Sequence, residues 1–148
     1  MKNYVEFLTG NYVINIAIVC WFAAQGLKIV YNYVRFRKFD LRLFFSSGSM
    51  PSSHSALVVG TATAVAKVSG IQSVSFGIAA VVACIVMYDA TGVRRAAGEQ
   101  AKVLNYMMEH WKETTPEMFQ KELKELIGHT PFEVASGAIL GLLIGLAA

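Results

Sequence analysis

Four long apolar segments, joined by short polar loops and one long polar stretch, dominate the sequence. They cover residues 11–33, 52–68, 71–88 and 130–148. A helix needs about 20 apolar residues, with a range of ~17–25, to cross the hydrocarbon core of a bilayer. The pattern therefore predicts an all-α, integral membrane helical bundle with about four transmembrane helices, in a single domain over residues 1–148.

Residues 89–129 form a polar insert between the third and fourth apolar segments. Apolar positions recur at helical spacing over residues 100–110, and Thr114-Thr-Pro-Glu117 has the composition of a helix start, with the helix continuing to Ile127. We expect the two short helices to lie at the membrane surface or over the functional site. A lid, a membrane anchor and a dimer contact are all open roles for the insert.

Composition agrees with a membrane protein. Hydrophobic residues make up 55% of the chain and charged residues 16%, and the mean hydropathy is +0.47, which is too apolar for an ordinary soluble domain. Cys20 and Cys84 both fall inside apolar segments, so we expect buried small hydrophobes and not a disulfide or a metal pair. The N-terminal residues carry a charge of each sign and no small-residue cleavage site, so we do not expect a removable signal peptide.

The basic residues predict an orientation. Of the 13 Lys and Arg residues, most lie in the first loop (Arg35, Arg37, Lys38, Arg42) and in the polar insert (Arg94, Arg95, Lys102, Lys112, Lys121, Lys124). With four spans both regions lie on one side, which the positive-inside rule makes cytoplasmic, and both termini lie outside. Two separate basic blocks, unlike one continuous stripe, argue against a nucleic-acid partner. The compact chain suits a bacterial plasma membrane.

Some residues in the apolar segments predict how the helices face each other. Gln25 and Lys28 are costly in lipid, so we expect both to face the protein interior or the membrane interface. Gly137, Gly141 and Gly145 recur every four residues, which is typical of a seam where two helices pack closely.

A serine-rich stretch, Ser46-Ser-Gly-Ser-Met-Pro-Ser-Ser-His-Ser55, precedes the second apolar segment. Pro51 suits the first position of a helix, and the flanking serines can cap free backbone N–H groups. Such a helix start, with its positive dipole end, suits a phosphate. His54 would lie in the first turn, where it could pass a proton to a leaving group. A serine-rich cap with an incidental histidine is the plainer reading of this stretch alone.

The predicted topology gathers further reactive side chains at the same helix ends. His129 opens the fourth segment, and Glu133 lies one turn further on the same face. A neutral imidazole can attack phosphorus, a carboxylate can hold its tautomer, cations can neutralise the phosphate oxygens, and a second histidine can protonate the leaving oxygen. Asp89 has no ligand cluster around it, so an ion pair with Arg94 or Arg95 is favoured over a divalent ion.

These residues resemble the site of the type 2 phosphatidic acid phosphatases, which is shared with vanadium haloperoxidases. The first family motif is Lys, six residues, Arg, Pro; Lys28 and Arg35 keep the spacing, and Phe36 replaces the proline. The second is Pro-Ser-Gly-His, and here Ser53 replaces the glycine before His54. The third ends in His, three residues, Asp; His129 keeps the spacing with Glu133 as the acid, and its arginine would come from Arg94 or Arg95.

The chain is more similar still to the divergent PAP2 branch of that family. Its signatures resemble Gly48-Ser-Met-Pro-Ser-Ser-His-Ser-Ala56, Tyr88-Asp-Ala-Thr-Gly-Val-Arg-Arg-Ala-Ala-Gly98 and Gly128-His-Thr-Pro-Phe-Glu-Val134. The resemblance implies that His129 is the nucleophile, Glu133 its orienting acid and His54 the general acid. It implies phosphate-binding roles for Lys28, Arg35, Ser52, Ser53 and one of Arg94 and Arg95, with Arg42 as a further candidate. Asp89 is a possible site residue as well, through its ion pair or a divalent ion. No cofactor is expected.

The function expected from the resemblance is hydrolysis of a phosphate monoester, on a lipid, through a phosphohistidine. Phosphatidylglycerol phosphate, phosphatidic acid and an isoprenoid phosphate are the candidate substrates, and a homo-oligomer is an open possibility. The main alternative is a non-catalytic membrane protein that binds anionic lipid head groups through its basic loops. Halide oxidation with vanadate and a small transporter are further alternatives.

Overall fold

The computed structural model describes residues 9–37, 39, 41, 44, 49–110 and 128–148. Over these residues the regular structure is helical, with no strand: α1 (Tyr12–Phe36), α2 (Ser53–Ser69), α3 (Val74–Thr91), α4 (Val93–His110) and α5 (Pro131–Ala147). The prediction of an all-α helical bundle is confirmed. Each predicted apolar segment corresponds to one helix, α1, α2, α3 or α5, within three residues at either end.

Polar caps fix where the helices begin. The Asn11 side chain accepts hydrogen bonds from the N–H groups of Val13 and Ile14 at the start of α1. Ser52 and Ser73 cap α2 and α3 in the same way. These side chains satisfy N–H groups that have no partner inside the helix.

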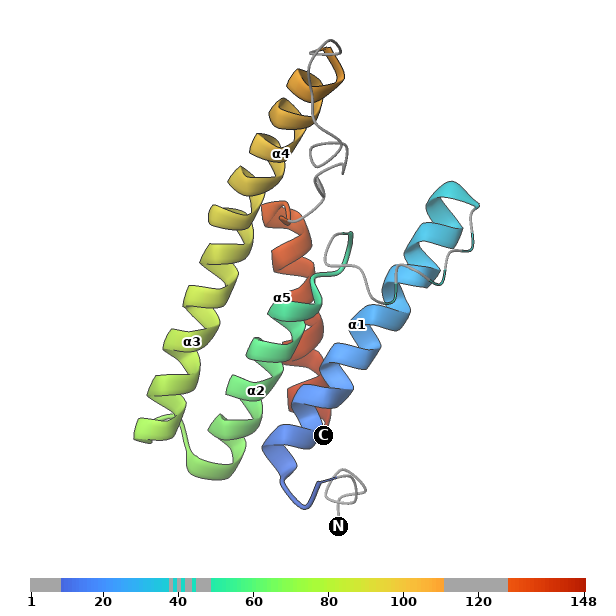
Figure 1. The fold of residues 1–148 in the computed structure, drawn as a ribbon. Coiled ribbons are helices and arrows are strands. Elements are labelled where there is room, and N and C mark those ends of the chain that lie inside the picture. Colours follow the sequence, from blue (N-terminus) through green and yellow to red (C-terminus); the bar gives the residue numbers. More distant parts are fainter. Residues whose placement is uncertain (1–8, 38, 40, 42–43, 45–48, 111–127) are drawn as a thin grey trace.

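The helix α2 is the centre of the bundle and packs against α1, α3 and α5. In Figure 1, the start of α1 and the end of α5 lie at one end of the bundle, and the starts of α2 and α5 lie at the other end. Helix α1 diverges from the other helices, and its C-terminal end lies farthest from them. The topology thus brings the starts of α2 and α5 together with the end of α3.

The α2–α5 contact is a seam of small residues, as the glycine spacing predicts. A methyl group added at Gly141 would overlap the carbonyl oxygen of Ala56, and one at Gly137 would overlap that of Ser52. At Gly145 it would meet the Thr63 side chain at 2.7 Å. The backbones of the two helices therefore lie closer together than larger side chains would permit.

The outer surface has the character of a lipid-facing one. Large apolar side chains are exposed on α1, α3 and α5, including Val34 at 68% and Val74 at 79%. Among the described residues, two helices are long and apolar enough to cross a bilayer, α1 and the continuous α3–α4 segment, and α5 is apolar but shorter. Helix α2, with 17 residues rich in Ala, Ser and Thr, is covered by three neighbours and needs little apolar outer surface.

The boundary between α3 and the polar insert differs from the prediction. The third apolar segment was expected to end at residue 88, but Asp89 lies inside the last turns of α3, which ends at Thr91. Helix α4 then begins at Val93, seven residues before the predicted start, and continues α3 in nearly the same direction beyond the bundle. Its main neighbour among the described helices is α3. The helix predicted from Thr114 to Ile127 lies outside the described residues.

Two further expectations were wrong. Pro51 does not occupy the first position of α2, because the helix begins at Ser53 and Ser52 is its cap. Cys84 is exposed, whereas Cys20 is buried, and both are free thiols. Only Ala83 and Ala90 of α3 are buried, so most of that helix, Cys84 included, faces away from the protein core.

Candidate active site

A histidine–carboxylate pair stands at the start of α5. His129 Nδ1 lies 3.1 Å from Glu133 Oε2, one turn apart. The same carboxylate oxygen accepts the N–H of Thr130 at 3.0 Å, and the Thr130 hydroxyl accepts the N–H of Glu133, forming a capping box. The helix cap therefore holds the Glu133 side chain in place against the imidazole. An ionised carboxylate can only accept, so this contact assigns the ring proton to Nδ1.

His129 is buried, and a backbone hydrogen bond also fixes its position. The residue is 2% exposed, and its N–H donates to the carbonyl of Ala90 in α3 at 3.0 Å. Burial lowers the pKa of His129 below its usual value, and the hydrogen bond to Glu133 opposes that shift. The Nε2 atom is buried and has no hydrogen-bond partner within the described part of the chain. A neutral ring with Nδ1 occupied and Nε2 unpartnered is the form in which imidazole acts as a nucleophile.

The second histidine approaches from α2. His54 lies in the first turn of α2, as predicted, and is half-buried. Its ring centroid is 6.3 Å from that of His129, in an edge-to-face orientation. The two imidazoles are therefore close enough to act on one phosphate group, although the two residues are 75 apart in the chain.

A buried lysine of α1 belongs to the same site as the two histidines. Lys28 is 0% exposed, and its Nζ donates to the Ser53 hydroxyl at 3.5 Å. The Glu133 carboxylate is near enough to attract the Lys28 ammonium group. The prediction that Gln25 and Lys28 face the interior is confirmed, since Gln25 is 3% exposed. Burying a charge is costly, and a phosphate-binding role for Lys28 stays a prediction.

Ser52 has a structural role in this arrangement. Its side chain accepts the N–H of Ser55 at 3.4 Å and the Ser55 hydroxyl at 3.0 Å. Its own N–H donates to the carbonyl of Glu133 at 3.0 Å. Ser52 thus fastens the start of α2 to the first turn of α5, and it is Ser53 that lies beside Lys28. A phosphate contact through Ser52 stays a prediction.

The two neighbouring arginines occupy different places. Arg94 Nε forms an ion pair with Asp89 Oδ2 at 2.5 Å, as the sequence favoured for Asp89. The charge of Arg94 also contributes to the lowered pKa of His129. Arg95 is exposed, and its backbone lies against Gly128, where a methyl group would overlap the Arg95 Cα. Of the two, the structure brings Arg94 toward the histidines.

The structure does not bring Arg35 to the site. Arg35 is exposed, and its guanidinium lies over the Phe36 ring, 5.8 Å from the ring centroid. It shares a helix face with Lys28 but lies seven residues beyond it, about 10 Å further along the axis, where α1 leans away from the bundle. Arg42 lies outside the described residues. The phosphate-binding roles of Arg35 and Arg42 stay predictions.

The sequence analysis did not predict that Glu133 also caps α5. The Thr130-Pro-Phe-Glu133 segment has the [Ser/Thr]-x-x-[Glu/Asp] spacing of a capping box, a signal that was readable before the structure. The Ala90 carbonyl, which holds the backbone of His129, had no such signal, because backbone contacts between distant helices leave no mark on residue identity.

The fold and the site together define a helical membrane protein with a buried His–Glu pair, a second histidine and a buried lysine at one end of the bundle. The chain belongs to the Divergent PAP2 family, whose profile matches residues 9–144. It is 40% identical over 152 residues, covering 96% of each chain, to a protein of Bacillus subtilis (strain 168) named "Uncharacterized membrane protein YuiD". No solved structure matches the chain.

Proposed function

We propose that the protein is a membrane phosphatase that hydrolyses a phosphate monoester carried by a lipid, through a phosphohistidine intermediate. The observation that carries the proposal is the buried His129 ring, with Nδ1 on Glu133 and Nε2 unpartnered among the described residues. Membership in the Divergent PAP2 family supports the reaction class.

In the first step, His129 Nε2 attacks phosphorus and the bond to the lipid oxygen breaks. His54 gives its proton to that oxygen, which leaves as the alcohol. Positive charge develops on the imidazole of His129 as the P–N bond forms, and the Glu133 carboxylate beside Nδ1 stabilises it. In this proposal Lys28, Ser53 and Arg94 neutralise or bind the phosphate oxygens.

In the second step, water attacks the phosphohistidine. His54, now neutral, accepts a proton from the water, and the P–N bond breaks to release inorganic phosphate and free His129. The same histidine thus acts as acid and then as base, which microscopic reversibility permits. The proposed steps use only water and the side chains named above.

The membrane determines how the substrate approaches. The site lies at the bundle end that holds the starts of α2 and α5. Among the described basic residues, Arg35 and Arg37 lie at the end of α1, and Arg94 and Arg95 lie in the first turn of α4. We propose that this end faces the cytoplasm and that the termini lie outside, in a bacterial plasma membrane. A lipid phosphate in the cytoplasmic leaflet, such as phosphatidylglycerol phosphate, phosphatidic acid or an isoprenoid phosphate, would reach the site without leaving the bilayer.

The test is phosphate release by the detergent-purified protein from a panel of these lipids, with and without EDTA. We expect release that survives EDTA and disappears in His129→Ala. His110→Ala, at the end of α4, is the matched histidine control and should keep full activity. If His129→Ala released phosphate as fast as the wild type, the proposed mechanism would be wrong. Release that required a divalent ion would give Asp89 a metal-binding role instead.

A second candidate is a non-catalytic protein that binds anionic lipid head groups. The exposed cations Arg35, Arg37 and Arg95 favour it, because a basic surface attracts anionic lipids without any chemistry. It predicts binding to anionic vesicles that weakens with added salt, and no turnover of any lipid phosphate.

A further inference from the structure

An apolar groove runs between α1 and α5 on the outside of the bundle. Its volume is about 460 Å³, within the ~300–1,000 Å³ typical of small-molecule sites. Leu27, Val30 and Val34 line it from α1, and Ile139, Leu140 and Leu143 line it from α5. Ile139 and Leu143 are each 59% exposed. The groove is therefore open toward the region that a bilayer would occupy.

One end of the groove adjoins the candidate active site. Leu27 immediately precedes the buried Lys28, and Pro51, which also lines the groove, immediately precedes Ser52. Ser136 lines it as well, and its hydroxyl donates to the carbonyl of Glu133 at 2.9 Å. The polar site and the near end of the apolar groove are thus formed by the same three segments: α1 around Lys28, the start of α2, and the first turn of α5.

We propose that this groove holds the hydrocarbon chain of the substrate lipid while its phosphate lies at His129. The inference rests on the proposed function. A lipid with an anionic head and an apolar chain matches this arrangement, because the buried Lys28 ammonium group lies at the end of the groove that adjoins the candidate active site. The substrate then enters sideways between α1 and α5, and residues such as Ile139 and Leu143 determine which chains are accepted.

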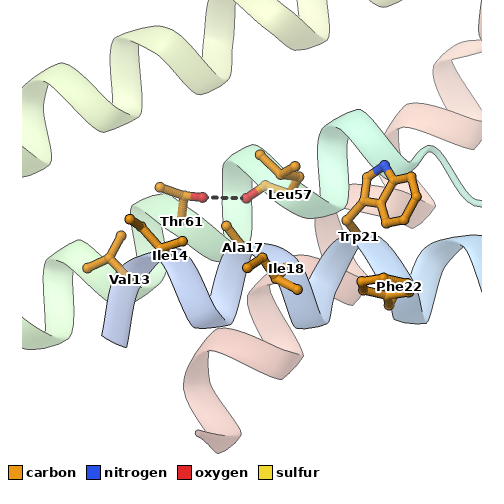
Figure 2. A pocket seen from close by; sticks show the side chains of 8 residues that line it. All are labelled: Val13, Ile14, Ala17, Ile18, Trp21, Phe22, Leu57 and Thr61. Carbon is orange, nitrogen blue, oxygen red and sulfur yellow. Dashed lines mark hydrogen bonds between the residues drawn. The ribbon is translucent and has the colours of Figure 1, made fainter. Parts of the chain in front are cut away.

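A second apolar groove provides the natural comparison. It has a volume of about 390 Å³ and lies between α1 and α2 (Figure 2). Its α1 residues end at Phe22, six residues or about 9 Å of helix before Lys28, and its nearest α2 residue to the site is Leu57, one turn after His54. This groove reaches the site only through Leu57, whereas the α1–α5 groove has lining residues immediately before both Lys28 and Ser52. We therefore assign the chain to the α1–α5 groove.

The test compares one tryptophan in each groove, Ile139→Trp and Ile18→Trp, on two substrates. One substrate is a long-chain lipid phosphate in mixed micelles, and the other is p-nitrophenyl phosphate, which has no chain. We expect Ile139→Trp to raise the KM for the lipid at least tenfold and to raise the KM for p-nitrophenyl phosphate far less. Ile18→Trp should behave as the wild type on both. The assignment would be overturned if Ile139→Trp kept the wild-type KM for the lipid. It would also be overturned if Ile18→Trp, and not Ile139→Trp, raised the KM for the lipid selectively.

A crosslinking measurement decides the question even if Ile139→Trp fails to fold. The wild-type protein is irradiated with a lipid phosphate that carries a diazirine in its chain, and the labelled peptides are mapped. Labelling of Val30 or Leu143 supports the groove. Labelling of Ile14 or Thr61, labelling spread over α3, or crosslinks to a second copy of the chain overturns it. Absence of phosphate release from both substrates would contradict the proposed function, while the labelling pattern would still report where the lipid chain lies.

Discussion

Replacing Glu133 with glutamine separates the two roles of this residue, which caps α5 and places a negative charge beside His129. Glutamine has the same size and keeps a side-chain oxygen that can accept the Thr130 N–H and so maintain the cap of α5. It removes the negative charge beside His129 Nδ1, 3.1 Å away. If the carboxylate stabilises charge that develops on the imidazole during attack on phosphorus, Glu133→Gln lowers kcat and leaves the stability of the bundle nearly unchanged.

The size of the effect follows from the contact. A hydrogen bond to a charged group contributes about 1.5–3 kcal/mol, and each ~1.36 kcal/mol changes a rate tenfold, which corresponds to a fall in kcat of roughly 10- to 150-fold. The same carboxylate oxygen also accepts from Thr130, and the Glu133 side chain is 23% exposed. Because both features weaken the single contact, we expect the lower part of the range, about 10- to 50-fold.

The assay is steady-state phosphate release, with thermal unfolding in the same detergent. Thr130→Ala is the matched control, because it breaks the capping box from the other side and does not touch the His129 ring. It should lower the free energy of unfolding by about 1 kcal/mol and keep the wild-type kcat. A wild-type kcat in Glu133→Gln, or an equal loss of kcat in Thr130→Ala, would refute the reasoning.

Three further predictions follow from the site and the seam. Since burial lowers the pKa of His129 and the neutral ring attacks, the acid limb of the kcat/KM profile should lie below pH ~6.5, the usual histidine pKa; a profile with its acid limb above that value would contradict this. Arg94→Gln should raise the KM more than Arg95→Gln, measured on one lipid phosphate, and equal effects would remove the distinction between the arginines. Gly141→Ala, which forces a methyl group into the α2 backbone, should cost about 1–3 kcal/mol of stability, whereas Gly77→Ala, where the added methyl meets open space, should not lower the melting temperature.

Relations within one segment were predictable from the sequence. Glu133 and His129 were expected to meet because they lie four residues apart, and they do, although His129 precedes α5 and the capping box turns the Glu133 carboxylate back toward it. The glycines of α5 form a seam because they recur every four residues. The burial of Lys28 followed from the cost of a charge in an apolar segment. In each case the helical repeat and the energetic cost of one side chain were enough.

Relations between helices were less predictable. Arg35 keeps the spacing from Lys28 that would place it on the same face, but the lean of α1 takes it away from the site. The choice of Arg94 over Arg95 depends on how α4 continues α3, and the exposure of Cys84 depends on how little of α3 is packed. Crossing angles between helices are set by many small contacts, so residue spacing in one segment does not report them.

The most direct test of the central claim is to trap the intermediate. Wild-type protein in detergent is mixed with a lipid phosphate labelled with ³²P in its phosphate group, quenched rapidly in base, and digested, and the labelled peptide is sequenced. The account predicts label on the peptide that contains His129, released by acid and stable in base as a phosphoramidate requires, and absent from His129→Ala. Phosphate release at a normal rate with no label at His129, or with label at His54, would contradict it.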